Sequence, residues 1–310
     1  MTLLAGSASW TDPTLLACGR FYPPQARTAE DRLRFYASQF GLAEVDSGFY
    51  RLPTAQNAQR WAERTPEGFV FDVKAFRAFT GHAIPLQALP RDLRGEVDAG
   101  GAGAAPRWRG LPGDVRQELW WRFRSALHPL QAAGRLGAVL FQFSPAVRPG
   151  PAVERHLEHC ADMMAGAVVA FEFRHRSWFA GAQAPRTLAL LRALGVVHVV
   201  VDAPQGVFDN TVPAVWEATR PGLAIVRLHG RNVAAWNGAA DVSSGRFQYV
   251  YRDDELAALL GPLRRLEAAA GTVHATFNTN YRDQGQVNAR RLLALWHGGA
   301  GASGGSAQLH

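Results

Sequence analysis

The stretch AFEFRHRSW, residues 170–178, decides the fold prediction. Phe171 and Phe173 alternate with Glu172 and Arg174, and successive side chains of a strand point to opposite faces. One face of this strand is therefore aromatic and the other is charged. Because the residues just before it are apolar, as at the buried end of a parallel strand, we expect the charged face to lie inside the molecule.

Strand-like and helix-like segments alternate along the chain. The opening stretch supplies the fifth strand, and the others are expected at residues 3–9, 43–50, 69–76, 137–145, 196–204, 223–230 and 272–280. Helices are expected after the cap residues Thr28 and Thr54 and over residues 115–133, 152–164, 185–194, 253–270 and 284–297. This order predicts an α/β fold, a single-domain TIM (β/α)8 barrel over residues 1–297. A doubly wound open sheet is the alternative.

Two segments depart from the alternation. Residues 80–113 are rich in glycine and proline without a clear period, which predicts a long insertion after the third strand. Its tip, residues 99–105, is expected to be mobile, and long insertions at this place often form lids. The tail, residues 298–310, resembles a linker and is expected to be disordered.

Composition narrows the class of protein. The net charge is +7, Lys74 is the only lysine, and Cys18 and Cys160 stand far apart, so neither a disulfide framework nor a zinc site is indicated. The positive charge is compatible with a small anionic ligand or a nucleic acid as partner. The start of the chain lacks a signal-peptide pattern, and no segment approaches the roughly 20 apolar residues of a membrane helix. We expect a soluble cytoplasmic protein without a membrane partner.

Strand parity separates two kinds of side chain. In a barrel each strand has one face toward the helices and one toward the interior. The face assigned outward is apolar and comprises Val45, Phe49, Phe71, Val73, Phe141, Phe143, Phe171, Phe173, Val199, Val201, Val226, Leu228, Ala275 and Phe277. The opposite face is polar and comprises Glu44, Asp46, Asp72, Lys74, Gln142, Glu172, Arg174, Asp202, Arg227, His229, Thr276, Asn278 and Asn280. This predicts a polar basin at the C-terminal end of the strands, where barrel enzymes have their active sites. A self-satisfied salt-bridge network that fills the barrel is the alternative.

Several segments, in order, resemble the YecE-like family, domain of unknown function 72. They are GSASW, FYP, RLRFYASQF, EVDSGFYRLP, WAERTPEGFVFDVKAFRAFTGH, GAVLFQFSP, FEFRHRSW, VDAP, RLHGR and TFNTNYRDQGQVNARRL, and the resemblance runs through residues 6–296. The resemblance implies a TIM-barrel fold and no established reaction. The chain departs from the family pattern at Asp46 and Gly48, where Asn and Thr are common, and at Ser9, where glycine is common.

The basin suggests acid–base chemistry. Glu44, Glu172 and Asp202 are candidate general acids and bases, and His229 is a candidate proton carrier or a simple hydrogen-bonding partner. Lys74 belongs to the same catalytic set. Residues that would bind the substrate are Asp46, Tyr50, Arg174, Trp178, Arg227, Arg231, Asn278, Asn280, Tyr281 and Arg282. Trp10 and Trp236 are further aromatic platforms for a base or a sugar, unless they serve packing.

Three functions fit these residues. The first is an enzyme acting on an anionic, phosphate-containing substrate, such as a nucleic-acid or nucleotide hydrolase, in keeping with the phosphate sites that barrels form after strands seven and eight. The second is a non-catalytic protein that binds nucleic acid or a phosphometabolite, and the third is a glycosidase or sugar isomerase. No cofactor and no metal site are predicted. A divalent metal held by Glu44, Asp46, Glu172, Asp202 and His229 stays an alternative.

Overall fold

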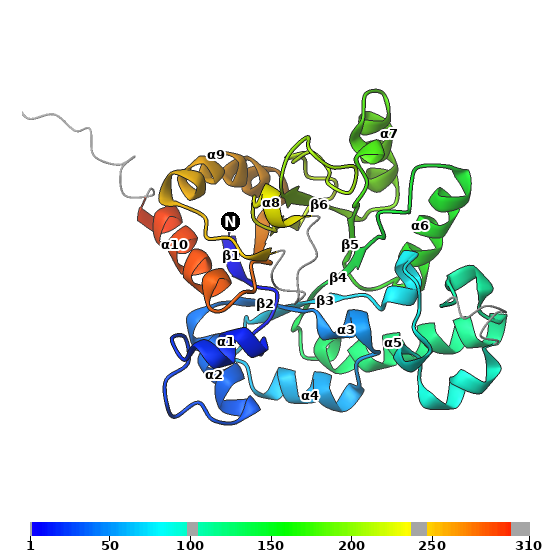
Figure 1. Cartoon of the computed structure of the whole chain (residues 1–310), viewed down its shortest axis with the longest axis horizontal. Coiled ribbons are helices and arrows are strands. Elements are labelled where there is room, and N and C mark those ends of the chain that lie inside the picture. The colour runs from blue at the N-terminus through cyan, green and yellow to red at the C-terminus, as the bar shows by residue number, and fades with distance from the viewer. Residues whose placement is uncertain (1, 98–104, 237–246, 299–310) are drawn as a thin grey trace, which may run out of the picture.

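The protein folds as a TIM barrel of eight parallel strands with helices around it (Figure 1). The computed structural model describes residues 2–97, 105–236 and 247–298. The strands are β1 (Thr2–Ser7), β2 (Leu42–Val45), β3 (Val70–Lys74), β4 (Leu136–Gln142), β5 (Val169–Glu172), β6 (Val197–Asp202), β7 (Ala224–Leu228) and β8 (Thr272–Phe277). They are ordered β1-β8-β7-β6-β5-β4-β3-β2, so the first strand pairs with the last. This order excludes the doubly wound sheet that the sequence left open.

Helices lie between consecutive strands except between β6 and β7, where the chain is irregular. The α-helices are α1 (Pro13–Cys18), α2 (Ala29–Gln39), α3 (Ser47–Tyr50), α4 (Ala55–Glu63), α5 (Gly113–Ala132), α6 (Pro151–Met163), α7 (Gln183–Ala193), α8 (Val233–Trp236), α9 (Asp253–Ala270) and α10 (Gln284–Gly298). The expected caps are present, since Thr28 and Asp31 form a capping box at α2 and the Thr54 side chain caps α4.

In the described residues the segment between β3 and α5 forms short turns of 3-10 helix. These are η1 (Arg77–Thr80), η2 (Leu86–Ala88), η3 (Arg91–Glu96) and η4 (Trp108–Gly110), while η5 (Arg176–Phe179) follows β5. Phe79, just before the insertion, stacks on Trp120 of α5 with ring centroids 3.7 Å apart. The mobile tip expected at residues 99–105 lies, except for Ala105, outside the described residues, as does the tail from residue 299.

A tyrosine closes the barrel between β1 and β2. The Tyr36 hydroxyl lies 2.8 Å from the backbone nitrogen of Ser7, which donates to it, and 3.1 Å from the carbonyl oxygen of Leu42, to which it donates. Gly6 is needed at this seam, because a Cβ atom there would lie 2.0 Å from the Leu42 carbonyl oxygen. A buried side chain thus takes over part of the role of a strand-to-strand ladder.

The predicted outward face is correct for most strands. The Phe and Val residues of β3, β4, β5 and β7 pack in the large core that separates the barrel from its helices. The interior holds a smaller apolar cluster, which fills the barrel on the side of the N-terminal ends of the strands. Its members are Ala138, Leu140, Ala170, Val197, Val199, Leu223 and Ile225. The polar side chains lie beyond this layer, toward the C-terminal ends of the strands.

Two details of the parity prediction are wrong. Val199 lies in the interior cluster and not in the outer shell, so β6 has the opposite orientation to the one predicted. The second strand also ends earlier than expected, because the chain turns into α3 directly after Asp46. Phe49 is therefore a helix residue and not part of a strand.

An acid–base pair lies on the interior face toward the N-terminal end of the barrel. His274 Nδ1 is 3.0 Å from Asp72 Oδ2, and both side chains are buried. Gly137 leaves room for the pair, since a Cβ atom at that position would lie 2.6 Å from Asp72 Oδ1. Asp72 thus belongs to the interior polar set, as predicted, but it lies nearer the N-terminal ends of the strands than the basin does.

Candidate functional site

Arg227 occupies the centre of the barrel and joins two carboxylates. Its guanidinium donates to Glu44 through Nε at 2.8 Å and through Nη2 at 2.6 Å. Its Nη1 donates to Gln142 at 3.1 Å and also to Glu172. All three charged side chains are buried, with relative exposures of 0–1%. We call these four residues the Arg227 cluster.

The Arg227 cluster matches the alternative of a self-satisfied salt-bridge network. A bidentate guanidinium–carboxylate pair satisfies most of the hydrogen-bonding capacity of both groups. Arg227 therefore serves here as an internal tie between β2, β5 and β7, and its polar hydrogens are engaged by protein groups. Gln142, which the sequence placed on the polar face without a functional role, completes the cluster.

The two carboxyl groups of the cluster differ in acidity. Burial raises the pKa of Glu44 above its ordinary value, and Arg227 offsets this only in part. Burial acts in the same direction on Glu172, but Arg227, His229 and Arg174 outweigh it and hold the pKa of Glu172 well below its ordinary value. Glu44 is consequently the carboxyl group better suited to exchange a proton near neutral pH.

His229 lies next to the Arg227 cluster with one ring nitrogen fixed. The amide of Asn278 is 2.8 Å from His229 Nδ1 and donates to it, which leaves the proton on Nε2. Nε2 is 3.3 Å from Glu172 Oε1, yet it is buried without a well-formed hydrogen bond among the described residues. Burial lowers the pKa of His229 to about 3, although Glu172 acts to raise it. The imidazole is therefore neutral and presents an N–H group.

Cationic side chains lie on the rim near β3 and β5. Lys74 Nζ is 2.7 Å from Asp46 Oδ1 and 4.6 Å from the centroid of the Phe49 ring. Arg174 Nη1 donates to Glu172 Oε1 at 3.0 Å, and its guanidinium lies over the Trp236 ring at 5.5 Å. Both cations are held within the protein, with relative exposures of 6% for Lys74 and 7% for Arg174.

His82, in the insertion, was not singled out from the sequence. Its ring contacts Phe49 with centroids 4.9 Å apart, and its Nδ1 lies 2.9 Å from Thr80 Oγ1. Burial, together with the positive charges of Lys74, Arg77, Arg174 and Arg107, lowers the pKa of His82 to about 3. We call these four residues the rim cations. Lys74 and Arg77 lie over the same Phe49 ring, 4.6 and 5.2 Å from its centroid, and Arg107 donates to the carbonyl oxygen of Gly81 at 2.6 Å. A single histidine in a glycine- and proline-rich segment gave no sequence signal for this position.

Asp202 does not join the basin, contrary to the prediction. It binds Arg231 through two hydrogen bonds of 2.9 and 2.7 Å and accepts another from the Tyr251 hydroxyl at 2.8 Å. Glu255 of α9 completes the group, with an oxygen 3.4 Å from Arg231 Nη1. The reason is the orientation of β6, whose odd-numbered residues Val197 and Val199 face the interior and turn Asp202 toward α9. Arg231 is thus paired with carboxylates of both Asp202 and Glu255.

Trp178 and Trp10 are packing residues and not platforms. Trp178 is fully buried, stacks on Phe173 with centroids 4.0 Å apart, and donates from Nε1 to the carbonyl oxygen of Val147 at 2.9 Å. Trp10 packs against Tyr36, Trp61 and Phe71 in the outer core. Trp236 is buried beneath Arg174, so among these aromatic candidates only Tyr50, with 51% of its surface exposed, lies open to solvent.

The loop after β8 is fastened to α1. Thr14 Oγ1 accepts from the backbone nitrogen of Arg282 at 2.7 Å and donates to the carbonyl oxygen of Asn280 at 3.3 Å. The Arg282 guanidinium lies over the Tyr281 ring at 5.1 Å. The side-chain oxygen of Asn280 is buried without a hydrogen-bond partner among the described residues. This loop therefore forms a separate part of the C-terminal rim, beside α1.

A pocket gives access to the acidic side of the cluster. It has a volume of about 190 Å³ and is lined by the segment after β1, by α2, by the junction of β2 and α3, and by the end of α4; the lining includes Glu44, Asp46, Trp61 and Arg64. Within the described ranges no group of three or more His, Cys, Asp or Glu side chains is arranged to hold a metal ion.

None of the described helices combines the length and the apolar character that crossing a membrane requires.

Comparison with known proteins identifies the family. Residues 4–307 match the family described as "Protein of unknown function DUF72". The UPF0759 protein YunF of Bacillus subtilis (strain 168) is 32% identical over 277 residues, which cover 88% of this chain and 89% of the relative. Crystal structures of DUF72 family proteins share the fold: one from Enterococcus faecalis V583 has a TM-score of 0.77 at 23% identity and covers 96% of both chains. Another, from Thermotoga maritima MSB8, has a TM-score of 0.74 at 22% identity and covers 96% of this chain and all of its own. This chain belongs to the DUF72 family.

Proposed function

We propose that this protein is an enzyme that acts on an anionic, phosphate-containing substrate at the C-terminal end of the barrel. The observation that carries the proposal is a cluster of positive side chains at the strand ends: Lys74 and Arg77 lie over the Phe49 ring, and Arg174 shares Glu172 with the neutral His229. Four positive side chains and an N–H donor at a strand terminus are suited to bind the oxygens of a phosphate group.

Each residue has a distinct role in this proposal. Lys74 and Arg174 neutralise the charge of the substrate, and His229 donates a hydrogen bond from Nε2 to one of its oxygens. Glu44, whose pKa is raised by burial, serves as the general acid or base and is reached through the pocket that it lines. Glu172 stays ionised and orients Arg227 and Arg174.

The Arg227 cluster weighs against the glycosidase alternative. Glycosidases require an open space between two carboxyl groups, either for a water molecule or for the sugar ring. Between Glu44 and Glu172 the guanidinium of Arg227 bonds to both carboxylates. The same engagement of both acids favours the second candidate, a non-catalytic phosphate-binding protein, and one experiment distinguishes it from an enzyme.

The experiment measures hydrolysis of p-nitrophenyl phosphate, bis-p-nitrophenyl phosphate and ATP by the purified chain. We expect Glu44→Gln to lower kcat by about 10²–10⁴-fold with little change in KM, as for the loss of a general acid or base. Lys74→Met should mainly raise KM. Glu267→Gln removes a buried carboxylate of α9, outside the site, and serves as the matched control with unchanged kinetics.

Other outcomes would change the conclusion. Equal activity of the wild type and Glu44→Gln, with both proteins folded by circular dichroism, would contradict the catalytic role of Glu44. Salt-sensitive binding of ATP without turnover would favour the non-catalytic alternative. Neither binding nor turnover of a phosphate compound would refute both phosphate hypotheses.

A further inference from the structure

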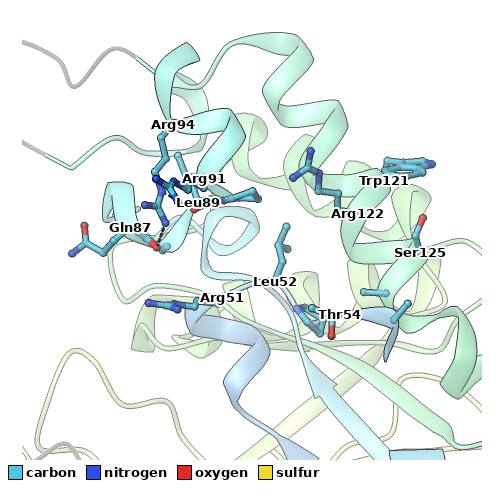
Figure 2. A pocket seen from close by; sticks show the side chains of 15 residues that line it. Arg51, Leu52, Thr54, Gln87, Leu89, Arg91, Arg94, Trp121, Arg122 and Ser125 are labelled. Carbon is cyan, nitrogen blue, oxygen red and sulfur yellow. Dashed lines mark hydrogen bonds between the residues drawn. The ribbon is translucent and has the colours of Figure 1, made fainter. Parts of the chain in front are cut away.

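A pocket of about 450 Å³ beside the insertion lies outside the candidate active site. One wall is the segment that leads from α3 to α4, one is the chain of η2 and η3, and the third is α5 (Figure 2). Its apolar lining includes Leu52, Pro53, Ala88, Leu89 and Ala126. A volume of this size is typical of small-molecule sites.

The charged side chains that line this pocket are all arginines, and only some of them are paired with other described residues. Arg94 is tied to the backbone oxygens of Leu89 and Gln87 at 3.0 Å each, and Arg122 is paired with Asp92 and Glu118. Arg51 and Arg91 form no side-chain hydrogen bond or ion pair with any residue in the described part of the chain. Two guanidinium groups are thus available at one pocket.

The polar and apolar parts of the pocket are separated. Figure 2 shows Arg51, Arg91 and Arg94 toward one end, Trp121 and Ser125 toward the other, and Leu52 between them. Trp121 is 64% exposed, which is unusual for a large aromatic side chain on the surface of a soluble fold. An exposed indole at the rim of an apolar hollow is typical of a surface that binds a ligand or a partner.

We propose that this pocket binds a small amphiphilic anion, with a phosphate or carboxylate head group and an apolar chain. Arg51 and Arg91 bind the head group, since guanidinium groups form paired hydrogen bonds with both anions. The apolar chain lies along Leu52 and Leu89 and reaches Trp121. The pocket is linked to the candidate active site through α3, because Asp46, the partner of Lys74, directly precedes this helix and Arg51 directly follows it.

The site is tested with octyl phosphate by isothermal titration calorimetry on the full chain. Two matched ligands serve as controls. Inorganic phosphate lacks the apolar chain of octyl phosphate, and the neutral octyl glucoside lacks its anionic head group. We expect octyl phosphate to bind at least tenfold more tightly than either. The double variant Arg51→Gln/Arg91→Gln and the single variant Trp121→Ala should each weaken it by about tenfold or more.

The control variant is Arg186→Gln, which removes an exposed arginine of α7 and should bind octyl phosphate like the wild type. Unchanged affinity in both pocket variants would overturn the proposal, because the ligand would then bind elsewhere. Equal binding of octyl glucoside, or binding only to phosphatidylglycerol vesicles, would also overturn it. Selective binding of an acidic peptide in place of octyl phosphate would assign the pocket to a protein partner.

Discussion

Replacing Arg227 by Met tests whether the Arg227 cluster is a buried charge network. The substitution keeps an apolar stem of similar length but removes a guanidinium that makes four hydrogen bonds with Glu44, Glu172 and Gln142. Removing one partner of a buried ion pair leaves an uncompensated charge and costs about 3–5 kcal/mol. Because two carboxylates lose their partner, we expect the free energy of unfolding to fall by at least this amount at neutral pH.

The pH dependence of this loss follows from the carboxyl groups. Without the guanidinium, burial raises the pKa of both acids in the folded state above their values in the unfolded chain. A raised folded-state pKa contributes stability below the unfolded pKa, and this contribution is lost as the pH rises through the folded pKa. The deficit of Arg227→Met should therefore shrink on acidification, by about 1.4 kcal/mol per pH unit for each carboxyl group that titrates.

In the wild type Glu172 behaves in the opposite way. Its pKa is held well below the ordinary value despite burial, so its contribution is present above the unfolded pKa and is lost as the pH falls. The stability curves of the wild type and the variant should consequently converge toward about pH 5.

The measurement is urea unfolding followed by circular dichroism at about pH 8 and about pH 5. The triple variant Arg227→Met/Glu44→Gln/Glu172→Gln serves as a rescue control, because a neutral set of similar volume avoids the unpaired charges. A loss below about 1 kcal/mol for Arg227→Met, the size of a surface ion pair, would refute the network. So would a loss that is the same at both pH values.

Three further outcomes are expected. Tyr36→Phe removes the hydroxyl that bridges β1 and β2, and it should lower the free energy of unfolding by about 1–3 kcal/mol in urea titrations. An unchanged free energy of unfolding would show that β1 and β2 stay together without this hydroxyl. Asp202→Asn should lower stability through Arg231 and Tyr251 while the KM and kcat for phosphate substrates stay unchanged, and a catalytic defect in the folded variant would return Asp202 to the site. His229 should remain neutral from about pH 8 to about pH 5, as seen by nitrogen NMR, because burial lowers its pKa to about 3, and a midpoint near 6.5 would contradict its burial. Since unfolding exposes this ring to protonation, it also lowers stability as the pH falls below 6.5.

The sequence by itself determined the barrel and most of its two faces. Alternation in AFEFR assigned Phe171 to the outer core and Glu172 to the interior, because the direction of a strand side chain depends only on its parity. Helix caps such as Thr28 were equally local and were predicted correctly. The family resemblance agreed with this fold, which the comparisons confirm.

Only the tertiary structure decided which polar residues meet. In β6 the odd positions are all valine and the even positions include Asp202, so the rule that the polar face points inward gave the wrong orientation for Val199 and Asp202. Parity also could not show that Arg227 binds the carboxylates of both Glu44 and Glu172. It could not show that the irregular insertion brings His82 close to the rim cations. These arrangements depend on distances between strands and loops far apart in the chain, which local periodicity does not encode.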